Sequence, residues 1–256
     1  MRTVISALLL LPAVALADSA FDGNWKTRMD SLKVSGNPDA FEVAGGMYTC
    51  STCAPEIKVQ ADGLDHPVSG HPYYDTVAVT VLSPTSIRIV DKQTGREVYN
   101  ITYVVSADGG TLNARLTDQT APQMVTEAFT ARRVAPGAAG AHATSGSWLP
   151  DRVSEANDAL LIITYRMTPL YFGMSWNGES YQAKFDGQEY PVEGDPAHTM
   201  VSVRRIDDHT VEETDHRDGK VTDEIRMSAA QDGRTMEITD NNLQRGQTTT
   251  VILDKQ

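Results

Sequence analysis

Three short segments of the sequence combine residue types that could do chemistry. Cys50 and Cys53 stand three apart, a spacing found in redox dithiols, zinc sites and local disulfides. Residues 173–178 approach the Gly-x-Ser-x-Gly pattern of serine hydrolases, but the segment is one residue too long and a hairpin is expected there. Residues 215–218 read Asp-His-Arg-Asp, which places acids beside a base. Each segment also has a plain structural interpretation.

The surroundings of the two cysteines favour a disulfide that clamps a turn in an oxidising compartment. A catalytic dithiol needs a helix N-terminus, and no helix is indicated near Cys50. Zinc would need two more ligands, and haem attachment fails because Ala54 stands where a histidine is required. We therefore predict a Cys50–Cys53 disulfide, no metal site and no cofactor.

The remaining catalytic patterns are weaker still. Residues 215–218 fall over an expected turn, where charged side chains are usually solvated. The sequence contains no phosphate-binding loop, no His-Glu-x-x-His and no EF-hand pattern. We expect no catalysis, and an enzyme whose site gathers residues from distant strands is the least favoured alternative.

Any such site would be positioned by a duplicated structure. Residues 62–117 align without a gap with residues 186–241 at a constant offset of 124, with 14 identities over 56 positions. The shared residues are mostly turn formers and strand apolars, including a Pro-Val-x-Gly-x-Pro block in each copy. Backbone structure demands residues of this kind. The duplication therefore predicts architecture and leaves the chemistry open.

Within each copy the hydrophobic period is two, which indicates half-buried strands. Asp-Gly and Asn-Gly pairs at hairpin spacing separate the strands. We predict an all-β chain of two tandem antiparallel up-and-down β-barrels or half-barrels, with little helix beyond a weak candidate at 151–161. The strands and turns expected in the first copy are 76–81, 87–89, 98–105 and 111–116, with turns at 62–63, 93–95 and 108–110.

The predicted domains follow the repeat. Residues 18–134 form the first barrel repeat and residues 146–256 the second. Residues 135–145 are rich in small residues, Pro and Gly, and are expected to be a flexible linker.

Residues 1–17 have the pattern of a signal peptide: Arg2, an apolar run, and Ala15-Leu16-Ala17 as a cleavage site. We expect a periplasmic or secreted protein without stable membrane insertion, because no other apolar stretch approaches spanning length. The net charge is −12 and becomes one unit more negative when Arg2 is removed. An acidic surface argues against nucleic acid as a partner.

Each copy opens on Gly-x-Trp, at Gly23-Asn24-Trp25 and at Gly146-Ser147-Trp148. With the up-and-down strands and the export signal, the chain resembles lipocalin-like (calycin) proteins, and more narrowly exported bacterial proteins that open Gly-x-Trp-Lys and carry the Pro-Val-x-Gly-x-Pro block. The second copy departs from this pattern, with Leu149 where the first has Lys26. The resemblance implies small closed barrels and a hydrophobic-ligand cavity, and it transfers no catalytic residues.

We therefore expect an exported tandem lipocalin-like protein that binds a small apolar or amphipathic ligand without catalysis. The alternative is a filled-core module of the cell envelope that docks a protein partner. Aromatic, Met and aliphatic side chains are expected to line the cavities. The candidates are Tyr103, Val105, Leu112, Tyr165, Phe172, Met174 and Trp176. Loop residues that could contact a ligand at a barrel mouth are His66, His71, Tyr73, Tyr190 and His198.

Overall fold

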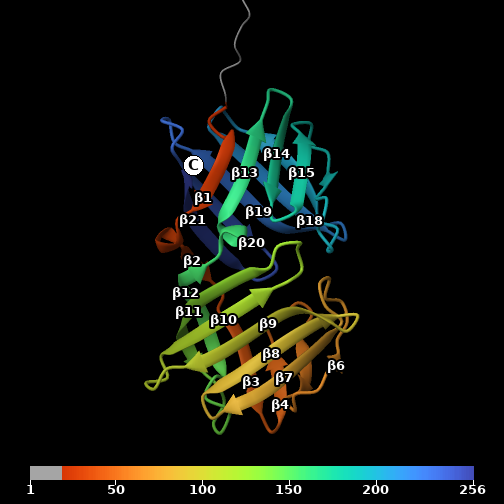
Figure 1. Cartoon of the computed structure of the whole chain (residues 1–256), viewed down its shortest axis with the longest axis vertical. Helices are drawn as coiled ribbons and strands as arrows, with labels where there is room; N and C mark the ends of the chain where they lie inside the picture. Colours follow the sequence, from red (N-terminus) through yellow and green to blue (C-terminus); the bar gives the residue numbers. More distant parts are fainter. Residues whose placement is uncertain (1–18) are drawn as a thin grey trace, which may run out of the picture.

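The computed structural model describes residues 19–256, so the predicted signal peptide lies outside the described part of the chain. Two antiparallel sheets, each curled into a nearly closed barrel, contain almost all of the regular secondary structure and confirm the predicted all-β class (Figure 1). The first barrel occupies the lower half of Figure 1 and the second barrel the upper half. A single turn of helix, α1 (Asp158–Leu161), connects β12 to β13.

The first barrel is a ten-stranded sheet in the order β5-β4-β3-β12-β11-β10-β9-β8-β7-β6. Its strands are β3 (Asp39–Ala44), β4 (Met47–Cys50), β5 (Ile57–Gln60), β6 (His66–Pro67), β7 (Thr76–Ser83), β8 (Ser86–Gln93), β9 (Arg96–Val105), β10 (Thr111–Asp118), β11 (Val125–Pro136) and β12 (Gly146–Ala156).

The second barrel follows the order β15-β14-β13-β1-β21-β20-β19-β18-β17-β16, with β2 (Lys33–Gly36) paired to β21 off this path. A short 3-10 helix, η1 (Met29–Ser31), separates β1 from β2. The strands of this barrel are β1 (Gly23–Thr27), β13 (Ile162–Met167), β14 (Tyr171–Trp176), β15 (Glu179–Lys184), β16 (Tyr190–Pro191), β17 (Met200–Arg205), β18 (Thr210–Arg217), β19 (Lys220–Ala229), β20 (Thr235–Asn242) and β21 (Gln247–Lys255).

The duplication predicted from the sequence reappears in the strand limits. β6, β8, β9 and β10 begin and end 124 residues before β16, β18, β19 and β20. The predicted hairpin turns also have the required backbone, because Thr94, Asn177 and Asp218 adopt positive φ beside a glycine. The ungapped alignment therefore corresponds to one fold built twice.

The opening strands, however, are exchanged between the repeats. β12 opens the second repeat, yet it lies between β3 and β11 in the first barrel, with Gly146 opposite both Phe41 and Pro136. β1 opens the first repeat, yet it lies between β13 and β21 in the second barrel, with Gly23 opposite Tyr165. Figure 1 shows β1 (red) beside β13 in the upper barrel. Each barrel is therefore completed by the Gly-x-Trp strand of the other repeat.

The exchange overturns the expected linker at 135–145. This segment joins β11 to β12, two neighbouring strands of the same barrel, and does not separate two domains. It lies across one end of the first barrel: the His142 amide donates to Val43 O, and the His142 ring nitrogen Nε2 contacts Ser83 O at 2.7 Å. Thr144 and Ser145 are buried. Small residues are needed here because the turn is tight, and a Cβ on Gly137 would lie 2.5 Å from the Ser145 side chain.

The expected domain boundaries assign β1 to the first barrel and β12 to the second. In the structure each of these strands lies in the other barrel. In a meander, a strand can be donated from either copy, because the two copies share the same pairing pattern. The connections that cross between barrels are η1 with β2, leading to β3, and α1, leading to β13.

Strand exchange predicts how the chain behaves when it is cut. A protease site inserted between Ala139 and Gly140, both exposed, would leave an N-terminal fragment that holds β1 and β2 of the second barrel and a C-terminal fragment that holds β12 of the first. We expect the cut fragments to co-elute in size-exclusion chromatography and to separate only in denaturant, because separation would remove a central strand from each sheet. The uninserted chain, treated with the same protease, is the control. Two separately eluting folded fragments would contradict the exchanged topology.

Candidate functional site

The best-defined hollow in the described chain lies inside the first barrel. It has a volume of about 410 Å³, within the range of small-molecule pockets. Most of its lining is aromatic or aliphatic. The apolar lining residues are Leu32, Ala40, Phe41, Tyr48, Ile101, Tyr103, Leu112, Leu116, Phe129, Ala131, Trp148, Pro150 and Val153.

Two of the three cavity residues predicted for this barrel line the cavity, namely Tyr103 and Leu112. Val105 lies two residues beyond Tyr103 on β9. It is buried in the core and does not line the cavity. Tyr103 stacks on Phe41 with ring centroids 5.4 Å apart, which fixes the orientation of both rings in the wall.

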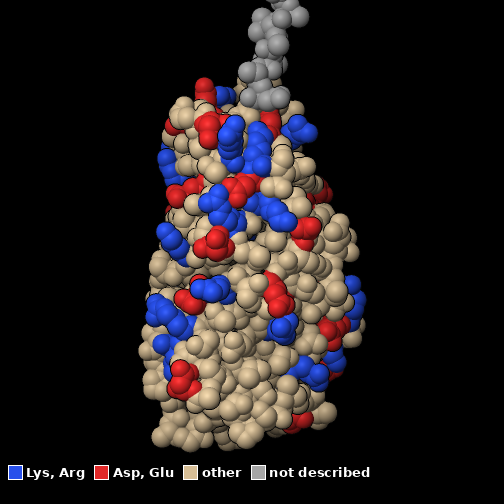
Figure 2. Space-filling view, turned by 60° about the vertical axis from the view of Figure 1, so that its left-hand side comes forward, with Lys and Arg blue, Asp and Glu red and all other residues tan. Residues whose placement is uncertain are grey.

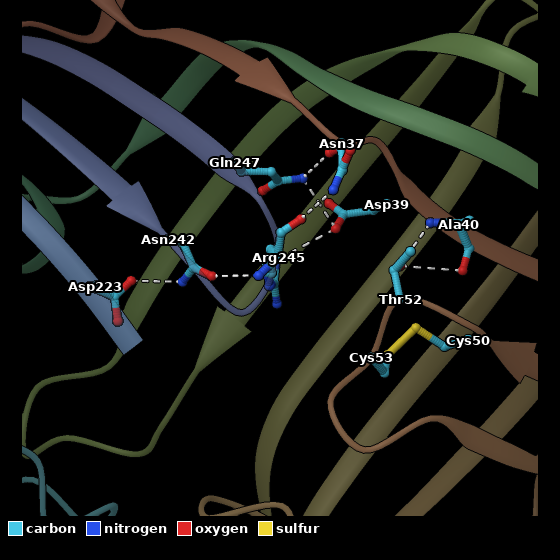
Figure 3. A network of polar contacts seen from close by, with 10 residues as sticks. All are labelled: Asn37, Asp39, Ala40, Cys50, Thr52, Cys53, Asp223, Asn242, Arg245 and Gln247. Carbon is cyan, nitrogen blue, oxygen red and sulfur yellow. Dashed lines mark hydrogen bonds and ion pairs between the residues drawn. A yellow bond between two sulfur atoms is a disulfide. The ribbon is translucent and has the colours of Figure 1, made fainter. Parts of the chain in front are cut away.

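The predicted disulfide is confirmed. Cys50 and Cys53 are bonded at 2.02 Å, and both line the cavity. Thr52, between them, accepts a hydrogen bond from the Ala40 amide at 2.9 Å, so the clamped turn is tied to β3 (Figure 3). The disulfide therefore forms part of the cavity wall.

The outer end of the cavity is closed by Trp148, the tryptophan of the exchanged strand β12. Its indole nitrogen donates to Thr144 O at 2.9 Å, and the Arg133 guanidinium lies 3.9 Å from the ring centroid. Arg133 also donates to the carbonyls of Gly109, Ala143 and Ser145. One arginine thus joins the tryptophan to two chain segments at the closed end, the turn at Gly109 and the connection at Ala143 and Ser145, a role that sequence reasoning did not assign to it.

The second barrel has the same closure. Trp25 donates to Phe21 O at 2.7 Å, and the Lys255 ammonium lies 5.5 Å from its ring centroid. Both tryptophans are almost fully buried. The tryptophans of the two Gly-x-Trp motifs therefore occupy equivalent positions, each buried at the outer end of a barrel.

We predict that Arg133 stabilises the folded protein through its contacts at the closed end of the first barrel. Arg133→Ala should lower the free energy of unfolding by about 2 kcal/mol, because the carbonyls of the closing segment lose charged donors and Trp148 loses its stacked cation. Urea denaturation followed by tryptophan fluorescence measures the change. Arg88→Ala, on the outer face of β8, is the matched control. An equal effect of both substitutions would show that Arg133 has no special structural role.

The second barrel is filled where the first is hollow. Tyr165 and Phe172, predicted as cavity residues, are core residues that stack with centroids 5.5 Å apart. Met174 packs against the same core, and Trp176 donates to Leu160 O. The prediction of a cavity lined by these four residues is therefore not met. Larger side chains occupy three equivalent positions: Met174 for Cys50, Tyr181 for Ile57 and Leu253 for Ala131.

The interior of the second barrel also carries carboxyl groups. Glu213, Asp215, Asp223 and Asp240 lie in neighbouring cross-strand rows of β18, β19 and β20. Tyr181 donates to Glu213, and Asn242 donates to Asp223. The equivalent positions in the first barrel are mostly apolar or aromatic: Ile89, Asp91, Tyr99 and Leu116.

Asp215 was expected to be a solvated turn residue, and this expectation is wrong. Asp215 and His216 belong to β18, and only Asp218 lies in the turn. Burial, followed by repulsion from Glu213, raises the pKa of Asp215, and burial likewise raises the pKa of Glu213. Burial also raises the pKa of Asp91, the equivalent residue in the first barrel, to about 7. The alternation of inward and outward side chains along a strand could have identified both aspartates as inward-facing. Each of them follows two inward-facing residues at alternate positions.

From these buried carboxyl groups we predict that the free energy of unfolding depends on pH. Unfolded carboxyls release their protons near pH 4, whereas the native pair keeps protons to higher pH. Between pH 4 and the higher pH at which the native carboxyls ionise, the native state therefore binds more protons than the unfolded state. The free energy of unfolding should fall as the pH rises from about 4 towards 8. Glu213→Gln should flatten this fall and raise stability at pH 8 by about 2 kcal/mol.

The measurement is urea unfolding at several pH values. Glu237→Gln, on the exposed face of β20, is the matched control because it removes a carboxyl outside the barrel. A Glu213→Gln profile that falls with pH as steeply as the parent profile would show that the interior carboxyls do not hold protons.

None of the predicted loop residues lines the cavity. Four of them contact residues of their own loop, and Tyr73 contacts the equivalent loop of the other repeat. His66 contacts Asp62 at 2.8 Å, and Tyr190 donates to Asp186 at the equivalent position. His71 stacks on Tyr74, and the His198 amide donates to Asp195 O. Tyr73 donates to the buried Asp195 at 3.1 Å and so joins the two Pro-Val-x-Gly-x-Pro loops across the barrel junction.

The mouth of the cavity lies at this junction and is shared between the barrels. Leu32 and Arg245, which accompany β2 and the β20–β21 hairpin, line the cavity together with Asp39, Glu127 and Arg152 of the first barrel. Figure 3 shows Arg245 between Asn242 of the second barrel and Asp39 of the first. The cavity is therefore apolar at depth and charged at its mouth.

Among residues 19–256, no group of three or more His, Cys, Asp or Glu side chains is placed to hold a metal ion. The helices in that part of the chain are too short to span a membrane. No protein-family model matches the sequence, and searches of curated proteins and of solved structures find no similar protein.

Proposed function

We propose that the protein is an exported binding protein with a lipocalin-like architecture, which takes a small apolar or amphipathic molecule into its first barrel. The observation that supports this most directly is the apolar cavity of about 410 Å³ behind a charged mouth. A cavity of this kind loses dispersion contacts when it is empty, and an apolar ligand restores them.

Under this proposal the repeats have different roles. The first repeat supplies most of the cavity wall. The second repeat supplies the filled core of the second barrel, the strand β12 that closes the first barrel, and part of the mouth. Export is supported by the sequence of residues 1–17 and agrees with the Cys50–Cys53 disulfide, since disulfides persist in oxidising compartments.

The filled second barrel favours an envelope interaction module as the second candidate. Such a module would dock a protein partner through its outer surface. On the face shown in Figure 2, Lys and Arg side chains are interspersed with Asp and Glu, so the net negative charge is not gathered there into one acidic patch. The surface in that view gives less support to a docking function than the cavity gives to ligand binding.

The binding proposal is tested by filling the cavity. Ala131→Leu places in the first barrel the side chain that Leu253 supplies in the second. We expect the parent protein to bind the neutral dye Nile red and the variant to bind it at least about fivefold more weakly, because the added methylenes occupy the ligand volume. Fluorescence titration measures both affinities.

Val134→Leu, at an exposed position of the same strand, is the matched control and should bind as the parent does. Thermal unfolding of all three proteins confirms that they are folded. A parent protein that binds no dye would favour the interaction module. Equal binding by the parent and Ala131→Leu would place any dye site outside this cavity.

A further inference from the structure

The cavity separates an apolar interior from a charged mouth. Its deep end is formed by Trp148, Leu112 and Ala131. Four charged side chains line it elsewhere: Asp39, Glu127, Arg152 and Arg245. A ligand that fills such a space must have an apolar part, and any polar part would have to lie at the mouth, where it remains hydrated or meets these charges.

Arg245 is held in position through its backbone. Its amide donates to Asn242 Oδ1 at 2.8 Å, and its carbonyl accepts a hydrogen bond from Asn37 Nδ2 at 3.3 Å (Figure 3). Its guanidinium lies 3.7 Å from Asp39, which is an ion pair but is longer than a hydrogen bond. The guanidinium donors of Arg245 are therefore available to an acceptor in the mouth.

Arg152 is the second cation at the mouth. It lies on β12 opposite Thr130, and within residues 19–256 it forms no ion pair. An arginine whose five donors lack a carboxylate partner is suited to recognise a planar anion.

The two acidic residues at the mouth, Asp39 and Glu127, do not form ion pairs with both arginines. Asp39 is already offset by Arg245. Glu127 forms no ion pair with either arginine within residues 19–256, and burial raises the pKa of its carboxyl. The donors of Arg152 are therefore left unpaired by either acid. The net negative charge of the whole chain acts over longer distances, where salt screens it within about 8 Å at physiological ionic strength.

We propose that the ligand is a single-chain amphiphile with an anionic head group, whose tail lies against Trp148 and whose head group lies between Arg152 and Arg245. This inference rests on the proposed binding function and adds the chemical class of the ligand. Arg152 and Arg245 both belong to the second repeat, whereas most of the cavity wall belongs to the first, so binding of the whole amphiphile requires both repeats.

The test compares three ligands with the same tail: dodecanoate, dodecanol and dodecylammonium. Each is titrated calorimetrically into the mature chain, below its aggregation concentration. We expect dodecanoate to bind at least about tenfold more tightly than dodecanol, since hydrogen bonds to a charged group add more than neutral ones. Dodecylammonium should bind most weakly.

Variants identify the groups responsible. Arg152→Gln combined with Arg245→Gln should abolish the preference for dodecanoate over dodecanol. Asp39→Asn should strengthen dodecanoate binding, because it releases Arg245 from its ion pair. Arg115→Gln, on the outer wall of the same barrel and paired with Glu155, is the matched control and should change neither affinity.

The outcomes separate this inference from the function on which it rests. Equal binding of dodecanoate and dodecanol would overturn the anionic class and leave apolar binding intact. A preference for dodecylammonium would overturn it in favour of recognition by Asp39 and Glu127. If none of the three ligands binds, and Nile red does not bind either, the proposed binding function itself fails.

Discussion

The structure depends on one constraint: each barrel is completed by a strand from the other repeat. β1 and β12 each fill a gap between two strands of the opposite copy, and each carries the tryptophan that closes that barrel. A sheet with a missing central strand exposes two rows of unpaired backbone groups, so neither barrel can form fully without the other repeat. Cooperative folding of the two halves, the closed outer ends and the shared mouth all follow from this exchange.

Once the two copies were bound together in this way, their interiors could diverge. The exchanged strands and the turns retain their glycines and tryptophans, whereas inward-facing positions differ in size and charge. Leu253 stands where the first barrel has Ala131, and Glu213 stands where it has Ile89. Packing density is sensitive to single methylene groups, so a few such differences are enough to leave one barrel hollow and the other filled.

The sequence predicted the parts of the fold that are set by local chemistry. Turn residues and alternation predicted where β7 to β10 lie, although these strands are longer than predicted, and the spacing of Cys50 and Cys53 predicted the disulfide. The exchange was not predictable, because both copies offer the same pairing pattern to β1 and β12. The hollow was also not predictable, since its volume is the sum of many side chains from ten strands. Only Tyr103 and Leu112 were correctly assigned to its wall.

The exchange also explains why the charged mouth lies where it does. Each barrel is closed at its outer end by a tryptophan with a cation near its ring, and the cavity of the first barrel is lined at its other end by residues of the junction. At the junction, the β20–β21 hairpin of the second barrel reaches the cavity of the first and contacts Asn37 and Asp39. Three of the four charged residues at the mouth, Asp39, Glu127 and Arg152, belong to the hollow barrel, and the second barrel adds Arg245. The second barrel therefore completes a polar rim that the hollow barrel forms only in part, which gives the duplication a physical role in recognition.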